Sequence, residues 1–472
     1  MKDKKLTYKI YTLGCKVNQH DSSSLAAKLQ AAGFFMEKND ADLAVINTCA
    51  VTKTALRKGR QMINRARREN PQAKILVVGC AVKIYKVEVE KWGADLVVEG
   101  NNIEQLIEKI FNFSRLGGTP LGRRQFFPPK RDPAKAVAIF KQFSTRLPAS
   151  PELQRGEPAR QVFNFQTDCK STVASTDKSR YFLKVQDGCR QFCSYCIIPY
   201  ARGELSSRPV AEVLAEAQIV AEAGIKEIVL CGIHLGLYGV DRITRNLPRR
   251  QAGAQRITNL TALIKELIKI KNLSRIRLSS IEVNEVTDEL IDLMKKERKL
   301  CRHLHIPLQS GCDKILKLMN RPYTTKMFAQ KIKKIRQLMP DIAIMTDVIV
   351  GFPGETNNDF RATTRFIKKI NFSKLHVFPF SAHERTLAAT LPNQVDGTVK
   401  NARAIKLNDL SCSLEKTYAE RFAGKPLTVI IDGRNQGASL RGRTEYNFDI
   451  QFISEKKYRQ GEVAQTENWE LL

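Results

Sequence analysis

Three cysteines spaced about one strand–helix–strand unit apart constrain the fold of this chain more than any other feature. Cys15, Cys49 and Cys80 each follow a short apolar stretch, and they lie 34 and 31 residues apart (15 to 49 and 49 to 80). A parallel βαβ unit takes about thirty residues. The carboxyl ends of parallel strands share one edge of a sheet, so the pattern predicts that the three thiols converge there.

Strands and helices alternate through the first 115 residues, which is typical of an open parallel α/β sheet. The predicted strands are Tyr8–Leu13, Leu43–Asn47, Lys74–Gly79 and Leu96–Glu99, and the predicted helices are Ser22–Ala32 and Ala55–Glu69. Residues 1–115 are therefore expected to form an α/β domain with the three cysteines at its carboxyl edge.

Three convergent thiolates can act as ligands of either of two metal groups. They can bind zinc with an open fourth position, or three irons of a 4Fe-4S cluster. Disulfides explain the cysteines poorly, because their number is odd (eleven) and the charged start Met1–Lys5 has no apolar signal segment. A buried cysteine can also be a plain small apolar residue, but three at successive strand ends favour a ligand role.

A second set of cysteines, Cys189, Cys193 and Cys196, has the spacing CxxxCxxC directly after a predicted strand. Three thiolates in one tight loop suit a cubane cluster and leave one iron free to chelate a small molecule. A zinc site is the alternative, although no fourth cysteine or histidine lies nearby in sequence. Six further strands are predicted at Tyr181–Gln186, Glu227–Gly232, Arg275–Ser279, His303–Pro307, Ala343–Val350 and Lys374–Pro379.

Six βα units predict a partial barrel, (βα)6, over residues 180–421. Residues 422–472 are strand-rich (Leu427–Ile431, Phe448–Phe452) and are expected to form a small β-barrel. Residues 116–179 are rich in proline and basic side chains and read as a linker with a short helix near Ala134–Phe143. The linker either adds affinity for RNA or acts as a solvated spacer.

The chain has 78 Lys and Arg against 48 Asp and Glu, a formal net charge of +30. This excess favours a polyanionic partner, of which nucleic acid is the commonest. No apolar run is long enough to cross a membrane and no amphipathic anchor helix is evident, so we expect a cytoplasmic protein without a membrane partner. No apolar helix is left unexplained, which favours a monomer.

Both cysteine sets together resemble the methylthiotransferases of the radical S-adenosylmethionine (SAM) superfamily. That family joins a three-cysteine domain, a radical SAM barrel and a small RNA-binding β-barrel called TRAM. The segments that carry the resemblance are Thr12–Gln19, Asp187–Gly203 and Thr346–Thr356. Lys16–Asn18, Ile233–Gly236 and His376–Pro379 are most similar to the branch that modifies N6-threonylcarbamoyladenosine beside the tRNA anticodon.

The resemblance implies two 4Fe-4S clusters and SAM as cofactors. Cys189, Cys193 and Cys196 would hold the cluster that cleaves SAM to a radical, and Cys15, Cys49 and Cys80 an auxiliary cluster that carries the sulfur. A methylthio group would then be added to C2 of the adenine, with electrons and sulfur from external donors. The residues that would contact SAM lie in the CxxxCxxC loop (Tyr195) and at the later strand ends (Gly232, Ser280, Gln309 and Gly351). We assign no catalytic role to His234 or His305.

The helix predicted after Cys49 is strongly basic, and it is the candidate surface for the tRNA anticodon stem-loop. Its candidate RNA-binding residues are Lys53, Arg57, Arg60, Arg65, Arg67 and Arg68. A solvated helix face is the alternative. Other functions that fit the residues are methylthiolation of isopentenyladenosine in tRNA, a radical SAM enzyme acting on a ribosomal-protein side chain, and a non-enzymatic RNA-binding protein with structural metal.

Overall fold

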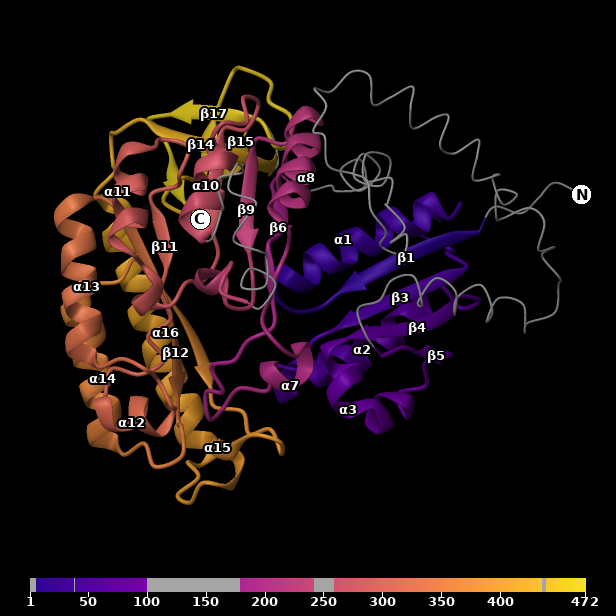
Figure 1. The fold of residues 1–472 in the computed structure, drawn as a ribbon, viewed down its shortest axis with the longest axis horizontal. Coiled ribbons are helices and arrows are strands. Elements are labelled where there is room, and N and C mark those ends of the chain that lie inside the picture. Colours follow the sequence, from indigo (N-terminus) through magenta and orange to yellow (C-terminus); the bar gives the residue numbers. More distant parts are fainter. Residues whose placement is uncertain (1–5, 38, 100–178, 242–258, 435–438) are drawn as a thin grey trace, which may run out of the picture.

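A computed structural model describes residues 6–37, 39–99, 179–241, 259–434 and 439–472. Figure 1 shows an N-terminal sheet (indigo) beside a curved central sheet with outer helices (magenta to orange), and C-terminal strands (yellow) at one end of the central part. All but the last residue of the predicted linker, with its predicted helix Ala134–Phe143, lies outside the described residues. No helix among the described residues has the length and apolar character needed to cross a membrane.

The N-terminal sheet is parallel throughout, with the strand order β2-β1-β3-β4-β5, as the alternating pattern predicted. Its elements are β1 (Thr7–Thr12), α1 (Lys16–Ala31), β2 (Phe35–Met36), β3 (Leu43–Thr48), α2 (Lys53–Glu69), β4 (Lys74–Gly79), α3 (Cys80–Glu90) and β5 (Leu96–Val97). Helix α1 begins six residues before the predicted Ser22, because Cys15 itself occupies the N-cap position. The short edge strand β2 was not predicted.

The central part contains the six predicted strands, and β12 and β13 have the predicted bounds. Its strands and the short hairpin β7–β8 are β6 (Tyr181–Lys184), β7 (Gln186–Asp187), β8 (Ser206–Ser207), β9 (Glu227–Cys231), β10 (Arg275–Leu278), β11 (His303–His305), β12 (Ala343–Val350) and β13 (Lys374–Pro379). Its helices are α7 (Ile198–Arg202), α8 (Val210–Glu222), η1 (Leu235–Leu237), α10 (Leu260–Ile268), η2 (Val283–Glu285), α11 (Asp288–Lys296), α12 (Asp313–Leu318), α13 (Thr325–Leu338), α14 (Asn357–Ile370), α15 (Leu387–Thr390) and α16 (Gly397–Glu420).

The six parallel strands form one curved series. Strands β6, β9 and β10 make one sheet, β11, β12 and β13 make another, and two isolated parallel bridges join them, Ile276 to Leu300 and Ser280 to His305. One continuous apolar core runs between this series and its outer helices. The expected partial (βα)6 barrel is therefore confirmed, with the strand ends that carry the predicted motifs at one end.

The C-terminal strands form an antiparallel sheet of five strands in the order β17-β14-β15-β16-β18. They are β14 (Leu427–Arg434), β15 (Ser439–Thr444), β16 (Asp449–Ile453), β17 (Val463–Thr466) and β18 (Glu470–Leu471). Buried arginines at the amino ends of the barrel strands fasten this sheet: Arg275 donates to the carbonyls of Thr428 and Arg443, and Arg277 to that of Thr444. The C-terminal sheet thus covers the end of the barrel opposite α7 and α15 (Figure 1).

The carboxylate of Glu227 balances these arginines. It is fully buried and accepts hydrogen bonds from Arg277 Nε at 2.7 Å and Nη2 at 3.2 Å. Burial opposes its charge, but the neighbouring arginines lower the pKa of Glu227. Removing one partner of such a pair leaves a buried charge uncompensated.

We therefore expect Glu227→Ala to destabilise the protein by about 3–5 kcal/mol, measured by urea unfolding. The control is Glu289→Ala, which breaks an exposed pair with Lys265 (2.7 Å) and should change stability by less than about 1 kcal/mol. Equal effects of the two substitutions would contradict this account of how the C-terminal sheet is held.

Candidate functional site

Cys15, Cys49 and Cys80 lie at the carboxyl edge of the N-terminal sheet, as predicted. Cys15 precedes α1, Cys49 follows β3, and Cys80 begins α3. Asn18 fixes the first two loops, because its side-chain amide donates to the carbonyls of Leu13 (2.8 Å) and Thr48 (3.0 Å). A Cβ on Gly14 would lie 3.2 Å from Cys49 Sγ, so only glycine lets the Cys15 loop approach this closely.

The three thiols influence one another electrostatically. Burial raises the pKa of Cys49 to about 11, and the charges of Cys80 and Cys15 add to the rise. Burial also raises the pKa of Cys80, although Arg202 opposes this change. The thiols of Cys49 and Cys80 are therefore protonated at neutral pH in the metal-free chain, and binding a metal group would release those protons.

Cys189, Cys193 and Cys196 lie in the loop between β7 and α7, and two of them have cationic or imidazole neighbours. His234 Nδ1 lies 3.2 Å from Cys189 Sγ, and Arg321 Nη1 donates to Cys193 Sγ at 3.3 Å. Burial raises the pKa of Cys196 to about 12, and the charges of Cys193 and Cys189 add to it. His234 and Arg321 thus contact two of the three sulfurs, and the charge of Arg321 opposes the rise that burial causes in the pKa of Cys193.

The donor chemistry of both sets fits a 4Fe-4S cluster, in which each thiolate binds a different iron. Among the residues that the structure describes, no three His, Cys, Asp or Glu side chains are placed to share a single metal ion. A cubane cluster does not require such a site, because its ligands bind separate irons.

Arg202, at the end of α7, connects the two cysteine sets. It is 2% exposed and donates to Cys80 Sγ (3.2 Å), to Asp21 of α1 (2.8 Å) and to Asp187 beside the second cysteine loop (3.1 Å). Lys184 pairs with the same two carboxylates. Helix α7 also packs Ile197, just before it, and Ala201 into the core of the N-terminal sheet. The sheet and the barrel are therefore fixed to each other at this point.

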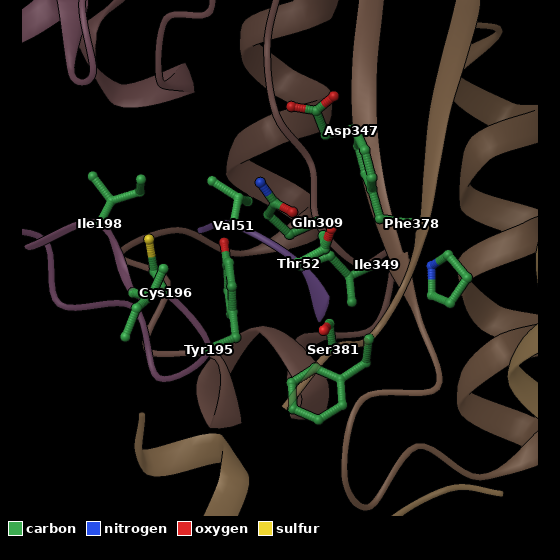
Figure 2. A pocket seen from close by; sticks show the side chains of 13 residues that line it. Val51, Thr52, Tyr195, Cys196, Ile198, Gln309, Asp347, Ile349, Phe378 and Ser381 are labelled. Carbon is green, nitrogen blue, oxygen red and sulfur yellow. The ribbon is translucent and has the colours of Figure 1, made fainter. Parts of the chain in front are cut away.

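A cavity of about 220 Å³ lies between the two sets. Val51 and Thr52, just after Cys49, line it together with Tyr195 and Cys196 of the second loop. Figure 2 shows Cys196 and Ile198 on one side of the cavity and Asp347 and Phe378 of the barrel strands on the other. Its walls are largely apolar and aromatic, which suits the faces of a purine base.

Two of the five residues predicted to contact SAM, Tyr195 and Gln309, line this cavity. Gln309 has a left-handed backbone (φ 64°), and its buried side-chain oxygen has no hydrogen-bond partner in the described part of the chain. Such strain and an unpaired buried acceptor are typical of binding sites.

The other three, Gly232, Ser280 and Gly351, do not line the cavity. Gly232 packs against Gln186, and Gly351 packs against Lys400 of α16. Ser280 pairs with His305 through a backbone bridge. Their contacts with SAM stay predictions.

Arg202, Arg321 and Glu285 were missed as site residues by the sequence reasoning. Arg202 lies inside Asp187–Gly203, so its place in that segment was the available signal. Arg321 and Glu285 follow distant strands, and no spacing relates them to the cysteines. His234 is positioned by Glu285, whose carboxylate contacts Nε2. Burial opposes the charged imidazole, but Cys189 and Glu285 outweigh it and raise the pKa of His234 to about 10.

The basic helix is α2, and all six predicted RNA-binding residues are exposed on it. Two of them are engaged: Arg65 pairs with Glu69 at 2.6 Å and Arg67 with Asp95 at 3.7 Å. In the described part of the chain, Lys53, Arg57, Arg60 and Arg68 have no ion-pair partner. These four follow one stripe of the helix, and Lys53 begins it beside the cavity, where its backbone N–H donates to Ser381.

Comparison with known proteins agrees with this geometry. The sequence model of the radical SAM superfamily matches residues 183–367, and the sequence model of the uncharacterized protein family UPF0004 matches residues 7–99. The structure of the radical SAM methyltransferase TsrM from Kitasatospora setae, with cobalamin and a 4Fe-4S cluster bound, has a TM-score of 0.52 at 17% identity. The match covers 82% of this chain and 77% of that one, and it shows likeness of fold alone.

Fold and cysteine loop together define an enzyme of the radical SAM superfamily, which uses a 4Fe-4S cluster and SAM. Threonylcarbamoyladenosine tRNA methylthiotransferase MtaB of Bacillus subtilis is 38% identical over 90% of this chain and 84% of its own length. A tRNA-2-methylthio-N(6)-dimethylallyladenosine synthase of Thermodesulfovibrio yellowstonii is 31% identical over 95% of this chain and 92% of its own. The chain belongs to the radical SAM tRNA methylthiotransferases.

We expect Arg202→Met to cost about 3–5 kcal/mol of stability, because Asp21 and Asp187 would lose one of the two buried cations that they share. Limited proteolysis should then cut between the N-terminal sheet and the barrel sooner than in the wild type. The matched control is Lys334→Met, which removes an exposed pair with Asp288. An unchanged melting temperature of the Arg202 variant would contradict its proposed structural role.

The same contact predicts a pH dependence. Burial opposes the charge of Asp21, but Lys184, His20 and Arg202 hold its pKa well below the ordinary value of 3.8. A depressed folded-state pKa gives stability that is complete above the unfolded value and is lost as the pH falls below it. The stability difference between wild type and Asp21→Asn should be constant from pH 7 to about pH 5 and shrink below about pH 4. A difference that narrows between pH 7 and 5 would contradict the assignment.

Proposed function

We propose that this chain adds a methylthio group to C2 of N6-threonylcarbamoyladenosine at position 37 of tRNA. One observation carries the proposal: a single cavity is lined both by residues adjoining Cys49 and by residues of the second cysteine loop. A base bound there would adjoin both cysteine sets. The match to curated relatives along most of the chain supports this chemistry.

The cysteines would hold the two clusters, Cys189, Cys193 and Cys196 one of them and Cys15, Cys49 and Cys80 the other. When bound, the clusters and SAM supply the radical chemistry, the sulfur and the methyl group; electrons and further sulfur come from outside the chain. Arg321 and Arg202 donate hydrogen bonds to one cysteine of each set and would stabilise its thiolate. Hydrogen bonds to the sulfurs also set the potential of a cluster.

The chain would position the base through the walls of the cavity. Tyr195 and Phe378 offer aromatic surfaces, and Gln309 offers an unpaired amide oxygen. The apolar walls exclude water, which protects a reactive intermediate from side reactions. The reacting base must leave the anticodon loop stack to enter, which single-stranded RNA allows.

The threonylcarbamoyl substrate is supported by the relatives named MtaB, at 31–38% identity. Relatives named for dimethylallyladenosine, at 31–32% identity, make that nucleoside the second candidate. Threonylcarbamoyl carries hydrogen-bonding groups and a charge, whereas dimethylallyl carries neither. The substrate pocket can therefore be tested with the two nucleosides directly.

The test uses anaerobically reconstituted protein with SAM, a reductant, sulfide and tRNA that carries either nucleoside. Mass spectrometry of the digested tRNA should show a gain of one methylthio group on threonylcarbamoyladenosine. Cys49→Ala and Cys80→Ala should abolish the gain, whereas Cys412→Ala, at an exposed cysteine of α16, should retain it. Methylthiolation of dimethylallyladenosine alone would replace the proposed substrate with the second candidate.

The stripe on α2 predicts how RNA binding responds to salt. Replacing Lys53, Arg57 and Arg60 together by alanine should weaken binding of the anticodon stem-loop. It should also lower the slope of log affinity against log salt by about two, since each phosphate contact contributes about 0.7–0.9. Arg65→Ala, whose side chain already pairs with Glu69, is the control and should leave the slope nearly unchanged. Equal slopes for wild type and the triple variant would exclude this stripe from RNA binding.

A further inference from the structure

A second cavity, of about 240 Å³, lies inside the barrel. Its lining comes from helix α1 (Lys16), from the residue before β6 (Arg180), from the barrel strands (His303, His376) and from the C-terminal strands (Arg443). One water occupies about 30 Å³ of the liquid, so the space is large enough for a small organic group. We call this cavity the bore site.

Five cations line the bore site, and four of them have an acidic partner within 4.0 Å. Arg180 and Arg277 pair with Glu227, Lys374 pairs with Glu415 at 2.6 Å, and Arg443 pairs with Asp449 at 2.6 Å. Lys16 has no hydrogen bond or ion pair with any residue that the structure describes. Its ammonium group therefore faces the cavity as an unbalanced charge.

Buried polar atoms around the same cavity also have no partner among the described residues. They are Nε of Arg180 and Nδ1 of His303, whose residue is only 2% exposed. Leaving such groups unpaired costs about 1–3 kcal/mol each, so a cluster of unpaired polar atoms that line one cavity points to a ligand. A carboxylate matches a single unbalanced ammonium group with hydrogen-bond donors beside it.

The bore site adjoins the cavity between the two cysteine sets. His305 lines the bore site, and its Nε2 lies 3.0 Å from Oδ1 of Asp347, which lines the other cavity. His376 stacks on His305 with ring centroids 5.2 Å apart. Lys16 lines the same cavity as His305 and His376.

We propose that the bore site binds the carboxylate of the threonylcarbamoyl substituent, with Lys16 as its cationic partner; this rests on the proposed function. Asp347 and Gln309 at the junction accept hydrogen bonds from the urea N–H groups and the hydroxyl of the substituent. A dimethylallyl group would leave the Lys16 ammonium group and the Gln309 amide oxygen without a partner. A site built for hydrogen bonds rejects such an analogue far more strongly than an apolar pocket rejects an added polar group.

Binding of short anticodon stem-loops to the full-length protein, purified without oxygen, tests the proposal. Fluorescence anisotropy compares RNA with threonylcarbamoyladenosine and RNA with plain adenosine at position 37. Wild type should prefer the modified RNA by roughly ten- to a hundredfold, the range expected for hydrogen bonds to charged groups. Lys16→Met should reduce this preference to near unity without weakening the binding of plain RNA, and Lys16→Arg should restore part of it.

Two further variants keep the test informative. Lys16 adjoins Cys15, so His376→Leu, remote from the cysteines in sequence, provides a second way to alter the bore site and should also reduce the preference. Lys265→Met, at an exposed surface pair, should leave the preference unchanged. Iron content and circular dichroism of each variant establish that the fold and the cysteine sites are intact.

SAM carries a carboxylate too, so its binding is measured in the same variants. If Lys16→Met weakens SAM binding and keeps the preference for modified RNA, the bore site holds the cofactor carboxylate and the proposal is overturned. A preference retained by both Lys16→Met and His376→Leu overturns it as well. If the wild type methylthiolates dimethylallyladenosine instead, the proposed function itself fails, which the nucleoside assay shows separately.

Discussion

The buried contacts of Arg202 are the interaction on which the arrangement of the site depends. One guanidinium group bonds to the N-terminal sheet through Asp21 and Cys80 and to the barrel through Asp187. Lys184 also bridges Asp21 and Asp187, but Arg202 is the side chain that joins these carboxylates to a cysteine thiol. The pairing is costly to desolvate, so its value lies in fixing one geometry and not in adding stability alone.

The fold was largely predictable because its signals are local. Each strand of the barrel is short and is followed by a polar or glycine-containing motif, and β12 and β13 have the bounds expected from the sequence. The start of α1 was predicted too late, because a cysteine at an N-cap gives no capping signal of the kind that serine or aspartate gives. The edge strand Phe35–Met36 is exposed and only two residues long, so its pairing with β1 left no periodic pattern.

The candidate site was predictable only in part. The cysteines were predicted from their spacing, Tyr195 from its place in the CxxxCxxC loop and Gln309 from its place after a strand. The groups that surround the thiols could not be predicted in this way, because Arg202, Arg321 and His234 reach the thiols through tertiary contacts between distant segments. The surroundings of Lys16 could not be predicted from the sequence either. Its position after Cys15 is plain in the sequence, but its unpaired place inside the barrel depends on how the N-terminal sheet docks.

The length of the segment that contains helix α7 limits which insertions and deletions this chain can accept. Cys196 lies two residues before the helix and Arg202 is its last residue, so five residues, 197 to 201, separate a cysteine of one set from a side chain that contacts the other set. Each residue of an α-helix turns the chain by about 100° and advances it by about 1.5 Å. Inserting or deleting one residue here would swing the guanidinium away from Cys80 and Asp21. The length of this segment thus sets the spacing of the two cysteine sites. We expect substitutions on its exposed face to be tolerated and changes in its length not to be.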